Sequence, residues 1–470
     1  MTTITRNISL QKTISPVDGS VYVERMLATP DVIDEILRTS LHAQRAWRNV
    51  PLHERAAILT RFCDEFEKRG PQIAEELTWQ MGRPARYAPN EVGGTLERAR
   101  HMIAIAPQAL ADLDAGPKQG FTRFVHREPL GVVFTIAAWN YPYLIAVNSV
   151  VPALMAGNAV ILKHSAQTPL CAERFAECLA AAGLPAGVFQ YVHASHEDTD
   201  RIIRDPRINF VAFTGSVAGG HAVQRAASSR FIATGLELGG CDPVYVRNDA
   251  NLEHAIENIV DGAYFNSGQS CCGLQRVYVH HAVYPKFVEG FIDLTRRYVL
   301  DDPREATTTL GPVVRTAAAD AIRMQIDASV KSGAKPVIAE SAFSKSERGT
   351  PYLAPQVLLN VDHRMPVMRE EIFGPVAGIM RVTSDDEAVD LMNDSDFGLT
   401  AAIWTEDEEV GLALGRRVNT GTWFMNRCDY LDPALAWVGV KESGRGCTLS
   451  VVGYEHLTRP KSFHLRTKTS

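Results

Sequence analysis

Two cysteines stand side by side in a turn of small residues, at Cys271 and Cys272 within NSGQSCCGLQR. Small neighbours leave a thiol accessible, and a cysteine thiolate in such a turn is a competent nucleophile. Adjacent cysteines do not have the ligand spacing of a zinc site, so we expect no metal here. The chain contains no CxxC pair, and its eight cysteines indicate free thiols in a reducing compartment.

A second reactive side chain, Glu237, stands between apolar residues and just ahead of two glycines in GLELGGCDP. An apolar setting raises the pKa of a carboxyl group, which suits a general base that works near neutral pH. From this fragment alone, a surface or ion-paired glutamate is the alternative. The segment therefore predicts a general base if the fold buries it.

Two polar side chains are predicted at the carboxyl ends of β-rich runs. Asn140 follows GVVFTIAAW, and Lys163 closes AVILK. α/β proteins bind ligands at these ends of parallel strands, where an asparagine amide can donate to an oxyanion and a lysine ammonium can bind a hydroxyl or phosphate. Taken singly, the two fragments favour the simpler readings, an Asn–Tyr–Pro turn and a solvated lysine.

A glycine-containing turn, FTGSVAGG, leads from a predicted strand into a predicted helix. Gly215 and Gly220 let the backbone approach a phosphate, and the start of the helix supplies N–H donors. His221 and Ala222 replace the Lys and Ser/Thr of a P-loop, and the G-x-G-x-x-G fingerprint is absent. The turn is therefore compatible with phosphate binding but does not specify it.

The pattern of the whole chain predicts an α/β fold around these segments. Helical periodicity begins at Asp31 and continues in a second segment over about 52–66. From Gly131, short β-rich runs alternate with helical ones, which implies a largely parallel sheet with helices on both faces. A second α/β segment begins near Cys241. The alternating tail stretch SFHLR has no following partner, so we expect it to pair elsewhere, for example on a sister subunit.

The composition narrows the class of protein. The chain has 470 residues, 46% of them hydrophobic and 22% charged, with a formal net charge of −6. Dedicated nucleic-acid binders carry a basic excess, so this balance argues against that class. The most apolar stretch, 150–162, is interrupted by Pro152, Gly157 and Asn158 and is too short to span a membrane. The first residues lack the pattern of a signal peptide, and a cytoplasmic location is expected.

The order of these segments resembles the NAD(P)-dependent aldehyde dehydrogenase superfamily. The resemblance continues through EEIFGP at 370–375 and KESGRG at 441–446. It implies a Rossmann-like nucleotide-binding domain, an α/β catalytic domain and a small β oligomerisation arm that joins identical subunits into a dimer or tetramer. By this resemblance the nucleotide-binding domain covers 1–106 and 130–239, the catalytic domain 240–442, and the arm 107–129 and 458–467.

The resemblance also implies the catalytic roles. Cys271 holds the position of the nucleophile, which attacks an aldehyde carbon, and Cys272 holds a variable position beside it. The Asn140 amide and the Cys271 backbone N–H hold the oxyanion, and Glu237 activates the water that hydrolyses the resulting thioester. Family members that pass the acyl group to coenzyme A commonly lack this glutamate, so hydrolysis is expected and CoA acylation is the alternative. A member that kept the fold and lost the chemistry would not need all three residues.

For the cofactor, the resemblance implies NAD or NADP. Eight residues match positions in its cleft: Trp139, Lys163, Ala166, Gly215, Ser216, Gly220, Glu371 and Phe373. Lys163 matches a contact to the adenosine ribose, and Glu371 and Phe373 match residues that hold the nicotinamide ribose. Ala166 stands where many NAD-preferring members have a glutamate that binds the ribose 2′-hydroxyl. Its absence removes a repulsion against a 2′-phosphate, so NADP should be tolerated or preferred.

The substrate pocket is implied by the same alignment of motifs. Its walls are expected to include Tyr141, Asn148, Ser270, Cys272, Leu431 and Trp437. Tyr141 and Trp437 favour flat or apolar substrates, whereas Asn148 adds room and a polar contact. No arginine pair for a dicarboxylic semialdehyde is evident, although Arg427 lies close in sequence. A medium-sized apolar or aromatic aldehyde is therefore expected, with a semialdehyde as the alternative.

Overall fold

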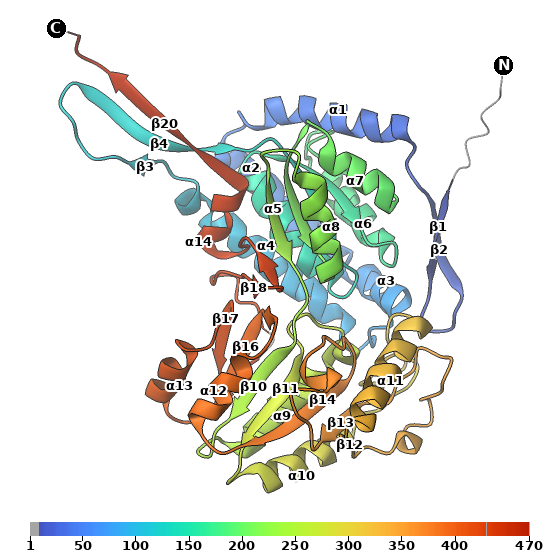
Figure 1. Ribbon diagram of the computed structural model, residues 1–470. Helices are drawn as coiled ribbons and strands as arrows, with labels where there is room; N and C mark the ends of the chain where they lie inside the picture. Colours follow the sequence, from blue (N-terminus) through green and yellow to red (C-terminus); the bar gives the residue numbers. More distant parts are fainter. Residues whose placement is uncertain (1–8, 429, 470) are drawn as a thin grey trace.

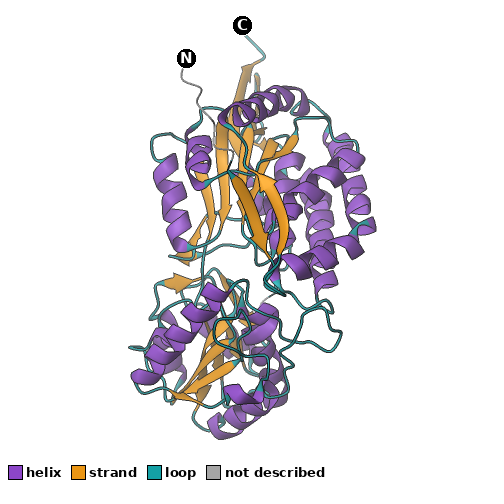
Figure 2. Cartoon of the chain, turned by 90° about the vertical axis from the view of Figure 1, so that its right-hand side faces the viewer, coloured by secondary structure: helices purple, strands orange, loops and turns teal. Residues whose placement is uncertain are grey.

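The computed structural model describes residues 9–428 and 430–469, which form two α/β lobes (Figure 1). The upper lobe of Figure 1 is built on a six-stranded sheet and the lower lobe on a seven-stranded sheet. Figure 2 shows helices on both sides of each sheet. The α/β fold expected from the sequence is therefore confirmed.

The six-stranded sheet brings together strand ends that are far apart in the sequence. Its strands, in spatial order, are β19 (Gly444–Arg445), β9 (Ala233–Glu237), β8 (Ile208–Thr214), β5 (Val132–Ala137), β6 (Ala159–His164) and β7 (Phe189–Tyr191). All neighbours are parallel except β19, which runs antiparallel to β9. Because parallel strands end at one edge, Lys163 and Glu237 lie along the same edge of this sheet.

The lobe of the six-stranded sheet also contains the helices of the first half of the chain. They are α1 (Pro30–Trp47), α2 (Leu52–Lys68), α3 (Gly70–Met81), α4 (Ala88–Ala109), α5 (Pro142–Met155), α6 (Pro169–Ala181), α7 (His196–Arg204) and α8 (Val217–Ala227). The two helices predicted before residue 70 are α1 and α2. Helix α6 begins at Pro169 and is followed by Gly183 at a φ of 86°, a left-handed conformation that favours glycine.

The seven-stranded sheet forms the second lobe. Its strands, in spatial order, are β12 (Lys335–Pro336), β13 (Gln356–Leu359), β14 (Val376–Val382), β11 (Leu274–His280), β10 (Asp242–Val246), β16 (Thr400–Trp404) and β17 (Thr422–Met425). Its helices are α9 (Leu252–Tyr264), α10 (Tyr284–Thr295), α11 (Thr316–Lys331), α12 (Asp385–Asn393) and α13 (Glu408–Gly415). Only β12, at the edge, is antiparallel to its neighbour in this sheet of the described chain.

A separate three-stranded sheet projects from the upper lobe (Figure 1). It consists of β3 (Leu113–Asp114), β4 (Phe121–Pro129) and β20 (Thr458–Arg466), in the order β20-β4-β3. The tail strand pairs antiparallel with β4 of its own chain over nine residues, so its partner in this sheet is an earlier segment of the same chain and not, as the tail pattern alone suggested, a sister subunit. The other edge of β20 has no strand beside it among the described residues.

The N-terminal region also contains a hairpin that helical periodicity did not predict. Strands β1 (Leu10–Ile14) and β2 (Val21–Met26) pair antiparallel before α1. The hairpin reaches the second lobe, where the Tyr352 hydroxyl donates to the Val17 carbonyl at 3.0 Å. The remaining short elements are β15 (Phe397–Gly398) paired with β18 (Val440–Lys441), and α14 (Ser450–Gly453).

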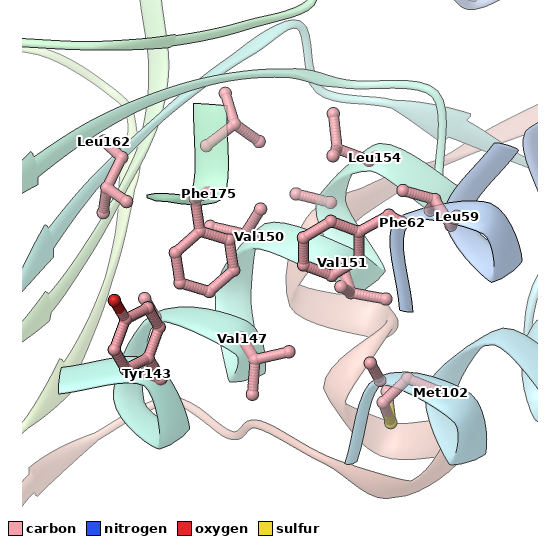
Figure 3. Close-up of a cluster of buried hydrophobic side chains, with 14 of the residues drawn as sticks. Leu59, Phe62, Met102, Tyr143, Val147, Val150, Val151, Leu154, Leu162 and Phe175 are labelled. Carbon is pink, nitrogen blue, oxygen red and sulfur yellow. The ribbon is translucent and has the colours of Figure 1, made fainter. Parts of the chain in front are cut away.

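Helix α5 is the centre of the largest buried cluster in the upper lobe, part of which Figure 3 shows. Twelve of its fourteen residues are buried, so it is apolar nearly all round, as expected for a helix enclosed by other elements. Phe62 of α2 and Phe175 of α6 stack at 5.7 Å, and the Phe175 ring also lies 5.7 Å from the ring of Tyr143 in the first turn of α5. This packing fixes the first turn of α5, which follows Asn140.

The domain ranges expected from the sequence stay predictions. Residues 443–457, which those ranges leave unassigned, include β19 and so join the six-stranded sheet. Within residues 9–428 and 430–469, no helix combines the length and apolar character needed to cross a membrane.

Candidate active site

The Cys271 turn begins with a strained loop. It follows α9 through a short 3₁₀ turn, Phe265–Gly268, in which Asn266 and Ser267 have φ values of 53° and 56°. Such left-handed conformations are uncommon outside glycine and persist only where neighbours hold them. Here the Asn266 amide donates to the Asn140 carbonyl at 3.0 Å and to the Gln269 carbonyl at 3.2 Å. The loop therefore ties the cysteine turn to the end of β5.

The two cysteines differ in exposure. Cys271 is partly exposed, whereas Cys272 is buried, and the Ser270 hydroxyl lies 3.4 Å from the Cys272 sulfur. The contact with Cys272, followed by burial of the thiol itself, raises the pKa of Cys271 well above its usual value. The thiol therefore keeps its proton at neutral pH, and a base must remove it before Cys271 can act as a nucleophile.

Asn140 lies against the same turn. Its side-chain amide donates to the Gln269 carbonyl at 3.2 Å, two residues before Cys271, and its own carbonyl accepts from Arg83 at 2.6 Å. The residue is buried. The structure thus brings the Asn140 amide next to the Cys271 turn, as expected from the sequence.

Glu237, the last residue of β9, is held by two hydroxyl groups. Thr448 donates to Oε1 at 2.6 Å, and Thr214 donates to Oε2 at 3.0 Å. Burial raises the pKa of Glu237, while the two hydroxyls and the charge of Arg98 lower it and only partly offset the burial. The carboxyl is therefore a stronger base than an exposed glutamate, and it is fixed in orientation.

Directly after Glu237, the chain crosses from the six-stranded to the seven-stranded sheet through Gly239 and Gly240. A Cβ atom at Gly240 would collide with the Cys271 carbonyl oxygen, and one at Gly239 would collide with the Glu371 carboxylate. Only glycine permits this close approach. The two glycines therefore allow Glu237, at the end of β9, and the Cys271 turn to lie close together.

A cavity of about 320 Å³ connects the nucleophile and the base. Cys271 and Glu237 both line it, together with all six residues that the sequence assigned to the substrate pocket: Tyr141, Asn148, Ser270, Cys272, Leu431 and Trp437. Further lining residues are not predicted from the sequence, among them Thr214, Phe265, Tyr430 and Arg98. Thr214 stands in the FTGSVAGG turn itself, whereas Arg98 lies on α4, which packs against α5.

Arg98 is the most consequential of the residues that were missed. It lies on α4, is buried, and donates from Nη1 to the Leu144 carbonyl at 3.0 Å and to Asn148 Oδ1 at 3.3 Å. Arg427, which the sequence placed near the pocket wall, is exposed and its guanidinium stacks 3.7 Å above the Tyr430 ring. The arginine inside the cavity is therefore Arg98.

The residues expected at the nicotinamide end of the cofactor lie together. The Trp139 and Phe373 rings meet edge to face at 5.6 Å, and Phe373 has a φ of 56°. Glu371 Oε1 accepts from the Gly240 N–H at 3.0 Å, and burial raises the Glu371 pKa to about 7. A carboxyl beside two glycines is suited to hydrogen bonding with ribose hydroxyls.

At the adenosine end, Lys163 is buried on β6 and its ammonium donates to the His164 carbonyl at 3.3 Å. Burial lowers the Lys163 pKa, and no described carboxylate forms an ion pair with it. Ala166 follows in the loop, where its carbonyl accepts from the Thr13 hydroxyl at 2.8 Å. A buried ammonium without an ionic partner fits a ligand with hydroxyl or phosphate groups.

The glycine turn begins α8. Ser216 caps this helix, accepting from the Gly219 N–H at 3.2 Å, and a Cβ at Gly215 would meet the Phe213 ring. The helix start offers N–H donors and positive potential to a pyrophosphate. Gly220 is buried, and a Cβ there would meet the Leu238 side chain, so packing also accounts for this glycine. Together with Lys163, this donor set suits a dinucleotide.

No group of three or more metal-ligating side chains is present in the described part of the chain.

Comparisons with known proteins identify the family. Residues 5–463 match the model of the aldehyde dehydrogenase family. An aldehyde dehydrogenase of Paenarthrobacter nicotinovorans is 33% identical over 96% of this chain and 98% of its own, and the succinate semialdehyde dehydrogenase [NAD(P)+] Sad of Escherichia coli K12 is 32% identical over 94% of each. The chain therefore belongs to the aldehyde dehydrogenase family of NAD(P)-dependent oxidoreductases.

Solved structures agree in fold. A structure of Gox0499, described for its cofactor and substrate selection, has a TM-score of 0.93 and 31% identity and covers 97% of this chain and 99% of its own. The succinic semialdehyde dehydrogenase of Streptococcus pyogenes, solved with NADP+, has a TM-score of 0.93 at 26% identity and covers 97% and 100%.

Proposed function

We propose that the chain oxidises an aldehyde to the carboxylic acid through a thioester on Cys271, which water activated by Glu237 then hydrolyses. The observation that carries this proposal is the shared cavity: Cys271 and Glu237 line one space, with the Asn140 amide against the intervening turn. A nucleophile, a base and an oxyanion donor are the groups that acyl chemistry needs.

In the first half of the reaction, Glu237 accepts the proton of the Cys271 thiol, directly or through a water molecule, since the raised pKa of each group suits this exchange. The Cys271 sulfur then bonds to the aldehyde carbon. The Asn140 amide and the Cys271 N–H donate to the resulting oxyanion. Loss of hydride from this carbon leaves an acyl group on Cys271 as a thioester.

The second half uses Glu237 again, after it has released to solvent the proton that it took from the thiol. Its carboxylate takes a proton from a water molecule, the water oxygen bonds to the thioester carbon, and the bond to the Cys271 sulfur breaks. The carboxylic acid is released and the thiol is regenerated. Because Thr448 and Thr214 hold both carboxylate oxygens, the base is oriented before the water attacks.

NAD or NADP, when bound, supplies the hydride acceptor for this oxidation. Lys163 and the start of α8 would hold its adenosine and pyrophosphate, and Glu371 with Phe373 would hold the nicotinamide ribose. Ala166 supports use of NADP, since no carboxylate at this position opposes a 2′-phosphate. The names of several relatives, which specify NADP+ or NAD(P)+, point the same way. We expect kcat/KM with NADP to equal or exceed kcat/KM with NAD. A strong preference for NAD would contradict the proposed use of NADP.

Single-turnover kinetics test the reaction scheme. With Glu237→Gln, we expect a slow rise to about one reduced cofactor per subunit followed by a stall, because the Cys271 thiol lacks its base and water is not activated. With Cys271→Ala, we expect cofactor binding without any burst. A full burst and normal turnover in Glu237→Gln would refute the role of Glu237, and faster turnover of this variant on adding CoA would favour the acylating alternative.

The assembly and location belong to the same proposal. The three-stranded β20-β4-β3 sheet projects from the upper lobe, and an edge strand there is suited to pairing with a second copy, as a homodimer or homotetramer requires. Light scattering measures this directly, and a monomer would refute it. The eight free thiols of the described chain support a reducing compartment such as the cytoplasm.

A further inference from the structure

Arg98 places a positive charge in the wall of the catalytic cavity. The side chain comes from α4 and is buried, yet it lines the same space as Cys271 and Glu237. Nη1 is held by the Leu144 carbonyl and by Asn148 Oδ1, which fixes the guanidinium. No hydrogen bond joins Nε or Nη2 to another described residue, so this side of the fork is left for a ligand.

The acidic groups that face Arg98 are already engaged. Glu237 accepts from Thr448 and Thr214 on its two oxygens, and Glu97 accepts from the Tyr430 hydroxyl at 2.6 Å. Glu91 forms an ion pair with Arg83 and accepts from the Tyr143 N–H. Within the described part of the chain, Arg98 therefore has no carboxylate at ion-pair distance, although a buried charge is normally paired.

Asn148 supplies a second donor at the same end of the cavity. Because its Oδ1 accepts from Arg98, its Nδ2 is directed elsewhere and has no described hydrogen-bond acceptor. Asn148 also lines the cavity. A planar guanidinium and an amide N–H that lie together are well matched to a carboxylate.

We propose that Arg98, assisted by Asn148, binds a carboxylate at the far end of the substrate while the aldehyde lies at Cys271, so that the substrate is an oxo acid with an aldehyde end. This inference rests on the proposed function, since it names the substrate class of that same site. It replaces the apolar or aromatic aldehyde expected from the sequence with the semialdehyde alternative. The names of relatives, several of which are succinate semialdehyde dehydrogenases, are consistent with it.

The test compares substrates of matched shape. Succinic semialdehyde has a carboxylate where 4-methylpentanal has an isopropyl group of similar shape. Glutaric semialdehyde is one carbon longer than succinic semialdehyde. We expect the wild-type kcat/KM for the better semialdehyde to exceed that for 4-methylpentanal by on the order of 100-fold, as charge-assisted hydrogen bonds allow. A wild-type enzyme that prefers 4-methylpentanal would overturn the inference.

Three variants locate the effect. Arg98→Met should reduce this preference by on the order of 100-fold, mainly through KM for the semialdehyde, and Arg98→Lys should restore part of it. Arg100→Met, on the exposed face of the same helix, is the matched control and should keep the preference. If Arg98→Met lowers kcat/KM equally for both substrates, Arg98 acts on Glu237 and not on the substrate, and the inference fails.

Asn148→Asp provides a second, independent test should Arg98→Met not fold, which thermal unfolding and cofactor binding would reveal. A carboxylate at position 148 would pair with Arg98 and repel an anionic substrate, so KM for the semialdehyde should rise far more than KM for 4-methylpentanal. An equal change in both KM values would overturn the inference. A wild-type protein that oxidises none of these aldehydes with either cofactor refutes the proposed function itself, which is a distinguishable result.

Discussion

Thr448 should set the pH at which the enzyme becomes active. Its hydroxyl donates to Glu237 Oε1 at 2.6 Å and stabilises the ionised carboxylate. A hydrogen bond to a charged group contributes about 1.5–3 kcal/mol, and one pKa unit corresponds to about 1.4 kcal/mol. Thr448→Val, which keeps the shape and removes the hydroxyl, should therefore raise the Glu237 pKa by a further 1–2 units, roughly.

The sign of the effect follows from the role of Glu237 as a base. A higher pKa means that less of the carboxylate is ionised at a given pH, so activity should fall on the acid side and recover as pH rises. The measurement is kcat between about pH 5 and about pH 9 under conditions where thioester hydrolysis limits turnover. The acid limb of the profile should move upward by about 1–2 pH units in Thr448→Val.

Thr214→Val is the matched comparison. Its hydroxyl bonds the other carboxylate oxygen at 3.0 Å and lowers the Glu237 pKa less than Thr448 does. We therefore expect a shift in the same direction but smaller. If the acid limb stays in place in Thr448→Val, or if the activity lost at low pH is not regained at high pH, Glu237 does not act as the base in the way derived from its contacts.

Three further predictions follow from neighbouring residues. Gly240→Ala should lose most turnover while cofactor binding persists, because the added Cβ would collide with the Cys271 carbonyl; normal kcat would contradict this. Cys272→Ala should lower the pKa of the Cys271 thiol, since the contact with Cys272 is the main cause of its elevation, and alkylation rates against pH will measure the change. Burial raises the Asp242 pKa to about 8, so its buried charge should destabilise the fold as pH rises from about 4 to about 8. The melting temperature of Asp242→Asn minus that of the wild type should therefore increase across this pH window and stay constant above it. A difference that does not change with pH would refute the raised pKa of Asp242.

The sequence predicted the reacting groups because each one lies in a compact local motif. Glu237 and Cys271 are 34 positions apart in the sequence, but each follows a short β-rich or small-residue segment whose order is specific to the family. Cys271 is partly exposed and lines the cavity, in agreement with an accessible sulfur, but the contact with Cys272 and burial of the thiol raise its pKa, so the thiol is not ionised before a base acts. That effect depends on the surrounding cavity and not on the turn alone.

The residues that the sequence did not reveal act through long-range packing. Thr448 reaches Glu237 from 211 positions away, because β19 pairs with β9 and brings the following segment alongside. Arg98 lies on a helix whose polar residues would ordinarily face solvent, and only the packing of α4 on α5 directs it inward. The β1–β2 hairpin was missed since its alternation is short and largely exposed.

The two-glycine crossing at Gly239 and Gly240 limits how this enzyme can be recombined. Glu237 ends β9 of one sheet and Cys271 precedes β11 of the other, and they lie close together because Gly239 and Gly240 have no side chains at the crossing. In a chimera that takes its two lobes from different relatives, this junction would therefore decide whether Glu237 and Cys271 are correctly placed, even where both hydrophobic cores fold well. Directed evolution by domain shuffling should place its breakpoints away from residues 237–242, and a library built in this way should retain hydrolysis more often than one cut inside that segment.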